Sequence, residues 1–226
     1  MSKVDIETLK RLQKYDSATI QNAAIRVRGY VDESEDYTGP ELKCFNDGGS
    51  TVVGYAVTTE VQTLNLPEKI LDWNEYYDEL ANSDFPLISI LKDIDNPSGR
   101  GASFGDVMAY RHVSLGVSGV VIDGSLRDLE GIKEAKCPIW AKGRVPGHGP
   151  FNLVSLGKTI EVSGLKISHG DLLVCDKDGI TNIPLNYAEK ISRVCEDVRN
   201  DEFKSKEVFS SKDFDYESWK NQDKEY

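Results

Sequence analysis

The chain has 226 residues, of which 27 are Lys or Arg and 38 are Asp or Glu, so its formal net charge is −11. Nucleic acids and anionic membranes bind basic surfaces, so this balance argues against both kinds of partner. No apolar run approaches the ~18 residues that span a bilayer, and the charged start lacks the apolar core of a signal peptide. We therefore expect a cytoplasmic protein that is long enough to bury a hydrophobic core.

The first part of the chain predicts helices followed by alternating strands and helices. Apolar residues at helical spacing begin the pattern, and Asp16 or Ser17 is placed to cap the second helix. Pro67 marks the entry to an acidic helix. The predicted elements are helix 4–15, helix Thr19–Arg28, strand 51–64, helix Leu66–Asn82 and strand Pro86–Asp95.

The middle of the chain continues this alternation. Its predicted elements are a glycine-rich loop 96–101, a helix Gly105–Ser114, a strand Val117–Asp123, a turn at Gly124-Ser125, a helix Asp128–Lys136 and a strand Pro138–Ala141. Short strands separated by Gly-Asp or Asp-Gly turns follow, up to a polar helix that begins at Ala188. Strand–helix units beside a β-meander predict an α/β fold in stacked layers.

The last segment, 201–226, is highly charged but contains more aromatic residues than a solvated tail needs. We expect it to pack on the body or on a neighbouring subunit, with a loose tail as the alternative. Its aromatic residues are Phe203, Phe209, Phe214, Tyr216 and Trp219.

The four cysteines are far apart and form no CxxC pair, which argues against a disulfide framework or a zinc site. We predict buried or unused thiols. The three histidines are equally scattered. The cysteines are Cys44, Cys137, Cys175 and Cys195.

A first candidate site is the helix start at Gly105, Asp106, Val107 and Met108. A glycine-rich loop that enters a helix presents unpaired amides at the positive end of the helix dipole, which suits a carboxylate or phosphate. The spacing of the preceding glycines matches neither the dinucleotide fingerprint nor the P-loop. A plain turn with a helix cap is the alternative.

A second candidate is Arg127-Asp128, which follows a predicted buried strand. Ligands often bind where such strands end in α/β folds. Arg127 offers a planar fork for a carboxylate, and Asp128 offers oxygen ligands for a hard divalent cation. The alternative is a helix cap beside a surface ion pair.

Five other residues are weaker candidates. Asp171, Asp176 and Asp178 are interpreted as turn residues, Lys142 as a solvated lysine and His148 as a loop histidine.

Together these residues resemble a known family. Asp106, twenty intervening residues and then Arg127-Asp128 reproduce the D-x20-R-D motif of RraA-like proteins, which include the 4-hydroxy-4-methyl-2-oxoglutarate/4-carboxy-4-hydroxy-2-oxoadipate aldolases. Three ordered segments carry the resemblance, which extends from about Leu9 to Glu196: 52–61, 105–128 and 164–184.

The resemblance implies a layered β/β/α core of the swivelling-domain type with flanking N- and C-terminal helices. It implies one RraA-like domain over 1–226, with a polar extension from about 201, assembled as a homotrimer or hexamer. The activity implied is a metal-dependent (class II) aldolase that cleaves 2-oxo acids to pyruvate, with oxaloacetate decarboxylase activity.

By the same resemblance, Arg127 and the helix start (Gly105, Asp106, Val107 and Met108) hold the pyruvate part of a small 2-oxo acid. Asp128 binds Mg²⁺, Mn²⁺ or another divalent cation. Arg127 stabilises the enolate, and Asp106 helps to deprotonate the 4-hydroxyl through a water. A glutamate of an adjacent subunit completes the site, and Glu196 is our candidate.

Several features depart from the family pattern. Asn22 stands where Asp is common, the segment 65–85 is long, His169 replaces a frequent Pro, and the tail is extended. Two other functions stay open. One is an interaction protein like the ribonuclease-regulating members of the family, and the other is a related lyase or hydratase acting on a sugar acid.

Overall fold

The long strand β2 (Val52–Gln62) shows how the fold is layered in this computed structural model, which describes residues 3–221. Val53, Tyr55 and Val57 face a core shared with the helices, whereas Val52 and Ala56 face a second core. Alternation along one strand therefore buries both faces of the sheet.

Within residues 3–221, nine strands form one sheet in the order β1-β6-β5-β3-β2-β10-β11, with β4 beside β5 and β7 beside β2. The pairs β2–β3, β3–β5, β4–β5 and β5–β6 are parallel. The strands are β1 (Lys43–Asn46), β2, β3 (Leu87–Asp93), β4 (Ala102–Phe104), β5 (Val117–Leu126), β6 (Ile139–Arg144), β7 (Asn152–Leu156), β10 (Leu172–Cys175) and β11 (Ile180–Ile183).

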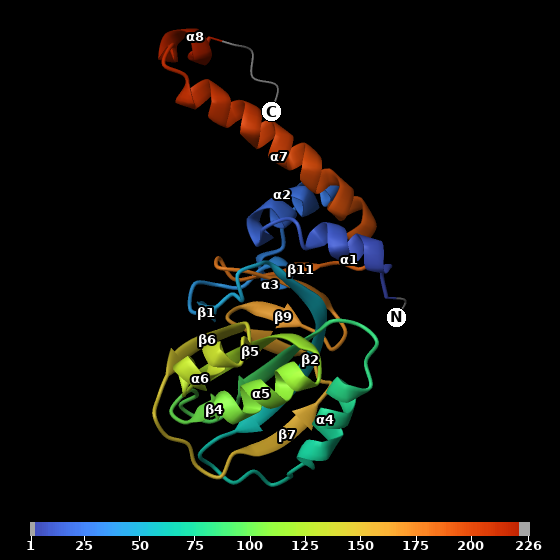
Figure 1. Cartoon of the computed structure of the whole chain (residues 1–226), viewed down its shortest axis with the longest axis vertical. Coiled ribbons are helices and arrows are strands. Elements are labelled where there is room, and N and C mark those ends of the chain that lie inside the picture. Colours follow the sequence, from blue (N-terminus) through green and yellow to red (C-terminus); the bar gives the residue numbers. More distant parts are fainter. Residues whose placement is uncertain (1–2, 222–226) are drawn as a thin grey trace.

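A hairpin covers one face of this sheet and helices cover the other (Figure 1). The hairpin is β8 (Ile160–Val162) and β9 (Leu165–Ile167). The predicted layered β/β/α architecture with flanking helices is confirmed. The helices are α1 (Ile6–Leu12), α2 (Ser17–Arg28), α3 (Glu33–Asp36), α4 (Trp73–Ala81), α5 (Asp106–Ser114), α6 (Leu129–Glu134), α7 (Ala188–Ser210) and α8 (Tyr216–Lys220).

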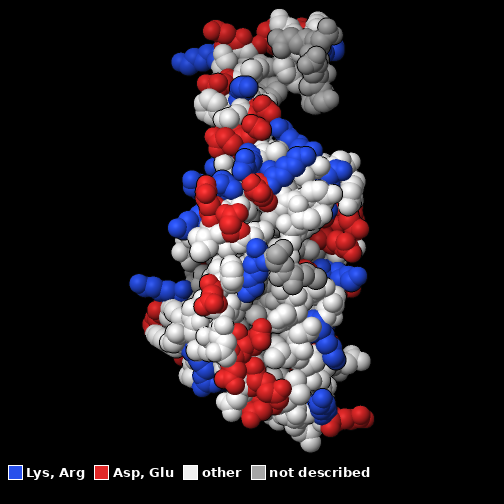
Figure 2. Space-filling model, turned by 90° about the vertical axis from the view of Figure 1, so that its right-hand side faces the viewer, with Lys and Arg blue, Asp and Glu red and all other residues white. Residues whose placement is uncertain are grey.

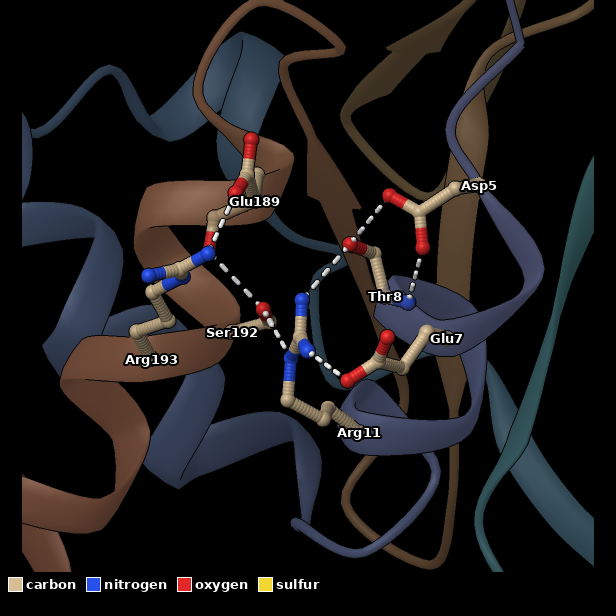
Figure 3. Close-up of polar contacts among 7 residues, drawn as sticks. All are labelled: Asp5, Glu7, Thr8, Arg11, Glu189, Ser192 and Arg193. Carbon is tan, nitrogen blue, oxygen red and sulfur yellow. Dashed lines mark hydrogen bonds and ion pairs between the residues drawn. The ribbon is translucent and has the colours of Figure 1, made fainter.

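Helices from the two ends of the sequence lie side by side. The Asp16 carboxylate caps α2, as predicted, by accepting a hydrogen bond from the Thr19 amide at 2.7 Å. Arg11 of α1 donates to the buried Ser192 hydroxyl of α7 at 3.2 Å and pairs with Glu7 at 2.8 Å (Figure 3). These contacts fix α7 on the body through its first turns.

Several predicted boundaries are wrong. The strand predicted to end at Ala141 continues as β6 to Arg144. Residues 66–72 are not helical, because Asp72 and Glu75 form a capping box that starts α4 at Trp73. The predicted turn at Gly124-Ser125 is instead the end of β5, which continues to Leu126 between its parallel neighbours β4 and β6. The site described below depends on this longer strand.

The far part of α7 leaves the body and carries α8 at its tip (Figure 1). No residue of α7 beyond Val198 is buried. The aromatic rings of this arm contact each other, with centroids 5.5 Å apart for Phe209 and Phe214 and 5.3 Å apart for Phe209 and Trp219. The expected packing on the body therefore holds only for the first residues of the tail, where Asp201 pairs with Arg26 of α2 at 2.8 Å. Packing of the aromatic arm on a neighbouring subunit stays a prediction.

Figure 2 shows this arm rising above the body and acidic side chains gathered on the lower half of the face that carries α4. No helix within residues 3–221 is both long enough and apolar enough to cross a bilayer.

The prediction of buried or unused thiols is confirmed. Cys137, Cys175 and Cys195 are buried and Cys44 is half-buried, and all four are free. Burial raises the pKa of the Cys137 and Cys195 thiols to about 12, so both remain protonated at neutral pH.

Candidate functional site

The candidate residues meet where parallel strands end and helices begin. β4 ends at Phe104, directly before Gly105, and β5 ends at Leu126, directly before Arg127. The Arg127 amide donates to the Phe104 carbonyl at 2.9 Å, which locks the two strand ends together. The starts of α5 and α6 therefore lie next to each other at one edge of the sheet.

Residue 105 is glycine because a side chain would not fit there. Its backbone angles are extended and do not themselves require glycine. A Cβ at this position would lie 2.9 Å from Asp128 Oδ2 and 3.4 Å from Arg127 Nε. The start of α5 is thus in direct contact with both residues of the Arg-Asp pair. The structure brings these three predicted site residues together.

The side chains of Arg127 and Asp128 form an ion pair, Nε to Oδ2, at 3.1 Å, and both are about 40% exposed, at 38% and 41%. Asp128 occupies the N-cap position of α6, but its side chain makes no capping hydrogen bond and its backbone is left-handed, with φ of 56°. The helix-cap part of the alternative interpretation is therefore not supported, whereas its surface ion pair is present. The Asp128 carboxylate faces the site instead.

The amides at the start of α5 differ in what they bind. The Val107 amide donates to the Asp106 carboxylate at 2.7 Å, and the Val107 side chain is 68% exposed. Within residues 3–221 the amides of Asp106 and Met108 donate to no other residue. These two amides are the ones that are free for an anion.

Two cavities lie on either side of Arg127. The smaller, of about 90 Å³, is bounded by the start of α5 and by Phe104, His148 and Phe151. The larger, of about 610 Å³, is bounded by Arg127, Asp128, Glu130 and Arg144, among others. Arg127 thus borders both a small space with aromatic walls and a larger one lined in part by charged side chains.

Glu196 lies elsewhere in this chain. It borders a separate cavity of about 780 Å³ beside α2 and accepts a hydrogen bond from the Tyr15 hydroxyl at 2.7 Å. Burial and this contact raise the pKa of Tyr15 to about 12. In Figure 1, α7 runs away from α5 and α6. The role of Glu196 in completing the site of an adjacent subunit stays a prediction.

Of the weaker candidates, His148 borders the smaller cavity. Lys142 is not the solvated lysine that the sequence predicts, and the turn aspartate Asp171 has a structural role. Lys142 pairs with Asp123 at 2.6 Å, and the Asp171 carboxylate accepts from the Ser168 amide at 2.7 Å within a turn. In the glycine-rich loop 96–101, the Gly99 amide donates to the buried Asp93 carboxylate at 2.6 Å. The loop therefore serves as a strand connection rather than an anion site.

A buried polar chain behind α5 has no counterpart among the predicted site residues. His112, fully buried, shares a hydrogen bond of 2.5 Å with the Tyr76 hydroxyl of α4, which in turn bonds Ser89. Its other ring nitrogen lies 2.7 Å from the Met108 carbonyl. The position of His112 four residues after Met108, on the buried side of the predicted helix, is the signal that could have revealed it.

The sequence model of the RraA-like family, described as Aldolase/RraA, matches residues 18–181. Among curated proteins, the chain is 35% identical over 108 residues to "Uncharacterized protein MJ0644" of Methanocaldococcus jannaschii, which covers 47% of this chain and 50% of that protein. It is 32% identical over 88 residues to a protein of Halalkalibacterium halodurans named "Putative 4-hydroxy-4-methyl-2-oxoglutarate aldolase", which covers 38% of this chain and 42% of that protein. The matches span half or less of these two relatives.

A solved structure with a similar fold is that of Streptomyces coelicolor RraAS2, described as an unusual member of the RNase ES inhibitor RraA protein family. The TM-score is 0.71 at 22% identity, with 91% of this chain and 98% of that chain covered. At this identity the likeness shows a shared fold.

Proposed function

Because this chain belongs to the RraA-like family and packs Gly105 directly against Arg127 and Asp128, we propose that it is a metal-dependent lyase of 2-oxo acids. The proposed reaction is aldol cleavage of a 4-hydroxy-4-methyl-2-oxoglutarate-type substrate to pyruvate. The contact between the α5 start and the Arg-Asp pair is the observation that carries this proposal. The names of curated relatives that refer to this aldolase support it.

Arg127 and the start of α5 form the binding site for the 2-oxo acid in this proposal. The free amides of Asp106 and Met108 point to the place where a carboxylate is favoured by the helix dipole. Arg127 binds the same half of the substrate through its planar fork. Its positive charge then stabilises the enolate that forms when the C–C bond breaks.

Asp106 is the group that moves a proton in this proposal. Its carboxylate lies at the helix start, partly exposed, and holds the Val107 amide at 2.7 Å. It takes the proton of the substrate 4-hydroxyl through a water and returns it to the leaving enolate. Arg127 and Asp106 thus act on opposite ends of the bond that is cleaved.

The residues at the site fit a magnesium-type ion. Within residues 3–221, no three His, Cys, Asp or Glu side chains gather into a closed metal cage. Mg²⁺ is usually held by one or two carboxylates, with waters and substrate oxygens as its other ligands, and the Asp128 carboxylate suits that arrangement. When bound, such an ion supplies Lewis-acid stabilisation of negative charge on the 2-oxo acid.

The same site supports decarboxylation of oxaloacetate, since that reaction also leaves the enolate of pyruvate. We further propose a homotrimer or hexamer, in which Glu196 of one subunit completes the site of the next. The large exposed fractions of Val107 and Tyr110 on α5, 68% and 51%, support an interface beside the site.

The test is pyruvate release from 4-hydroxy-4-methyl-2-oxoglutarate and from oxaloacetate, with Mg²⁺ and then with EDTA, for the wild type and Arg127→Gln. We expect turnover that needs the ion and falls by about 100-fold or more in the variant. Folded protein that turns over neither substrate with Mg²⁺ or Mn²⁺ would overturn the lyase proposal.

A further inference from the structure

Arg144 stands beside Arg127 because of the register between two parallel strands. It is the last residue of β6 and pairs with Leu126, the last residue of β5. The next amide, of Val145, donates to the Leu126 carbonyl at 3.0 Å. Main-chain pairing therefore brings the two arginines to the same edge of the sheet.

Of the two arginines that border the larger cavity, Arg144 is the one that has no ion pair with any residue of the described part of the chain. Arg127 is paired with Asp128, and Glu130 is paired with Lys133 at 3.2 Å. Arg144 borders the same cavity, is exposed, and forms no ion pair or side-chain hydrogen bond with any residue of the described range 3–221. The wall thus presents an unneutralised guanidinium next to the proposed pyruvate site.

Residues 144–151 form a segment that runs along both cavities beside Arg127, and main-chain hydrogen bonds hold it in place. The Gly147 carbonyl accepts from the Ala102 amide at 2.8 Å, and the Gly149 amide donates to the Thr63 carbonyl at 2.7 Å. At its end, the ring of Phe151 stacks on Trp73 of α4, with centroids 4.9 Å apart. Its first residues border the larger cavity, and His148 and Phe151 border the smaller one.

The two cavities offer different environments to the two halves of a substrate held at Arg127. The smaller cavity has aromatic walls at Phe104 and Phe151 and also borders the Asp106 carboxylate. A second anionic group there would be costly to desolvate and would be repelled by that carboxylate. The larger cavity is open, is lined in part by charged side chains and includes the unpaired Arg144. A second anionic group is therefore favoured on the Arg144 side.

We propose that Arg144 is a specificity-determining residue that binds the second carboxylate of a dicarboxylic 2-oxo acid. This inference rests on the proposed function, since it assumes that Arg127 holds the 2-oxo acid end. A guanidinium binds a carboxylate through two parallel hydrogen bonds, so the preference is for a second carboxylate over a neutral group.

The first test compares binding of two five-carbon 2-oxo acids that differ by one carboxylate, 2-oxoglutarate and 2-oxopentanoate, by calorimetry in the presence of Mg²⁺. We expect the wild type to bind 2-oxoglutarate about 10- to 100-fold more tightly, and Arg144→Gln to lose that preference. Arg144→Lys should keep part of it, because it keeps the charge but not the fork. Arg193→Gln, which removes an exposed arginine on α7, is the matched control and should bind like the wild type.

The second test measures turnover of 4-hydroxy-4-methyl-2-oxoglutarate and of 4-hydroxy-2-oxopentanoate, which lacks the second carboxylate. Arg144→Gln should raise KM for the first about 10-fold or more and change the second less than about 3-fold. A wild type without a binding preference, or a variant that loses both substrates equally, would overturn the role of Arg144. Absence of turnover with the binding preference intact would count only against the lyase proposal.

Discussion

Gly131 of α6 leaves the space that Asp106 of α5 occupies: a Cβ on Gly131 would lie 2.6 Å from the Asp106 Cβ and 2.8 Å from its Oδ2. Glycine inside a helix costs roughly 0.5–1 kcal/mol relative to alanine. Gly131 is therefore explained by the space that Asp106 needs and not by the stability of α6. It couples the two helix starts that form the proposed binding site.

Gly131→Ala should displace the Asp106 carboxylate and lower kcat/KM for pyruvate release by about 10-fold or more, since the proposed proton transfer needs this group in place. The added methyl group favours the helix but clashes with the Asp106 Cβ, so the start of α5 must shift and the melting temperature should fall by a few degrees. Glu134→Ala, an exposed change on the same helix, is the control. Unaltered kinetics in Gly131→Ala would show that Asp106 is not held in position by this contact.

Asp128→Asn should retain the fold and lose metal-dependent turnover by about 100-fold or more. The backbone of residue 128 is left-handed, with φ of 56°, and Asn tolerates that conformation better than most residues. The amide keeps the shape of the side chain but loses the negative charge that a hard cation requires. Turnover with and without EDTA, together with a melting curve, checks this prediction.

Asp128→Ala is the informative partner to that variant. It should lose the same activity but also some stability, because alanine in a left-handed conformation costs roughly 1–2 kcal/mol. If Asp128→Asn retains wild-type turnover with Mg²⁺, the carboxylate is not the metal ligand.

The buried ion pair of Arg28 and Asp36 should be sensitive to the loss of either partner. Its atoms lie 2.6 Å apart, with side chains only 5% and 1% exposed. Burial alone would raise the pKa of Asp36, but its hydrogen bonds from Arg28 and from the Asp32 amide hold it below the usual range. Asp36→Ala should lower the free energy of unfolding by about 3–5 kcal/mol, as measured with urea, because it leaves a buried charge unpaired.

Two comparisons make this prediction specific. The double variant Arg28→Met/Asp36→Leu removes both charges and should recover much of the lost stability. Glu189→Ala breaks the exposed pair with Arg193 in Figure 3 and should change stability by less than about 0.5 kcal/mol. Equal losses in the buried and exposed pairs would contradict the argument from burial.

The parts of the site that depend on local sequence could be predicted. Arg127 and Asp128 are neighbours in the chain, and Gly105 precedes a helix whose periodicity is visible in the sequence. Placing that helix start against the Arg-Asp pair required the order of strands β4 and β5, which the family motif implied and the structure shows.

The parts that depend on pairing between distant segments could not be predicted. Gly124-Ser125 reads as a turn in isolation, and only the neighbouring strands β4 and β6 make it the end of a strand. Arg144 carries no local signal, since its role comes from its register with Leu126. The contact of Tyr76 with His112 likewise joins residues 36 positions apart.

The buried His112 should make the protein less stable as the pH falls. Burial, with a smaller contribution from nearby Arg111, lowers its pKa from 6.5 to about 4. The unfolded chain then takes up a proton below about pH 6.5, whereas the folded chain does so only near pH 4, so stability falls as the pH drops through this window. The loss is complete near pH 4 and amounts to about 3 kcal/mol, because one pKa unit corresponds to about 1.4 kcal/mol.

The measurement is the free energy of urea unfolding at pH 7 and pH 4.5 for the wild type and His112→Gln. The glutamine side chain does not titrate, so the variant should start lower at pH 7 but fall less on acidification. Other groups that respond to acid, such as the buried Asp93, whose pKa is raised by burial, affect both proteins alike and cancel in the comparison. Parallel loss in the two proteins would show that His112 is protonated as easily in the folded chain as in the unfolded one.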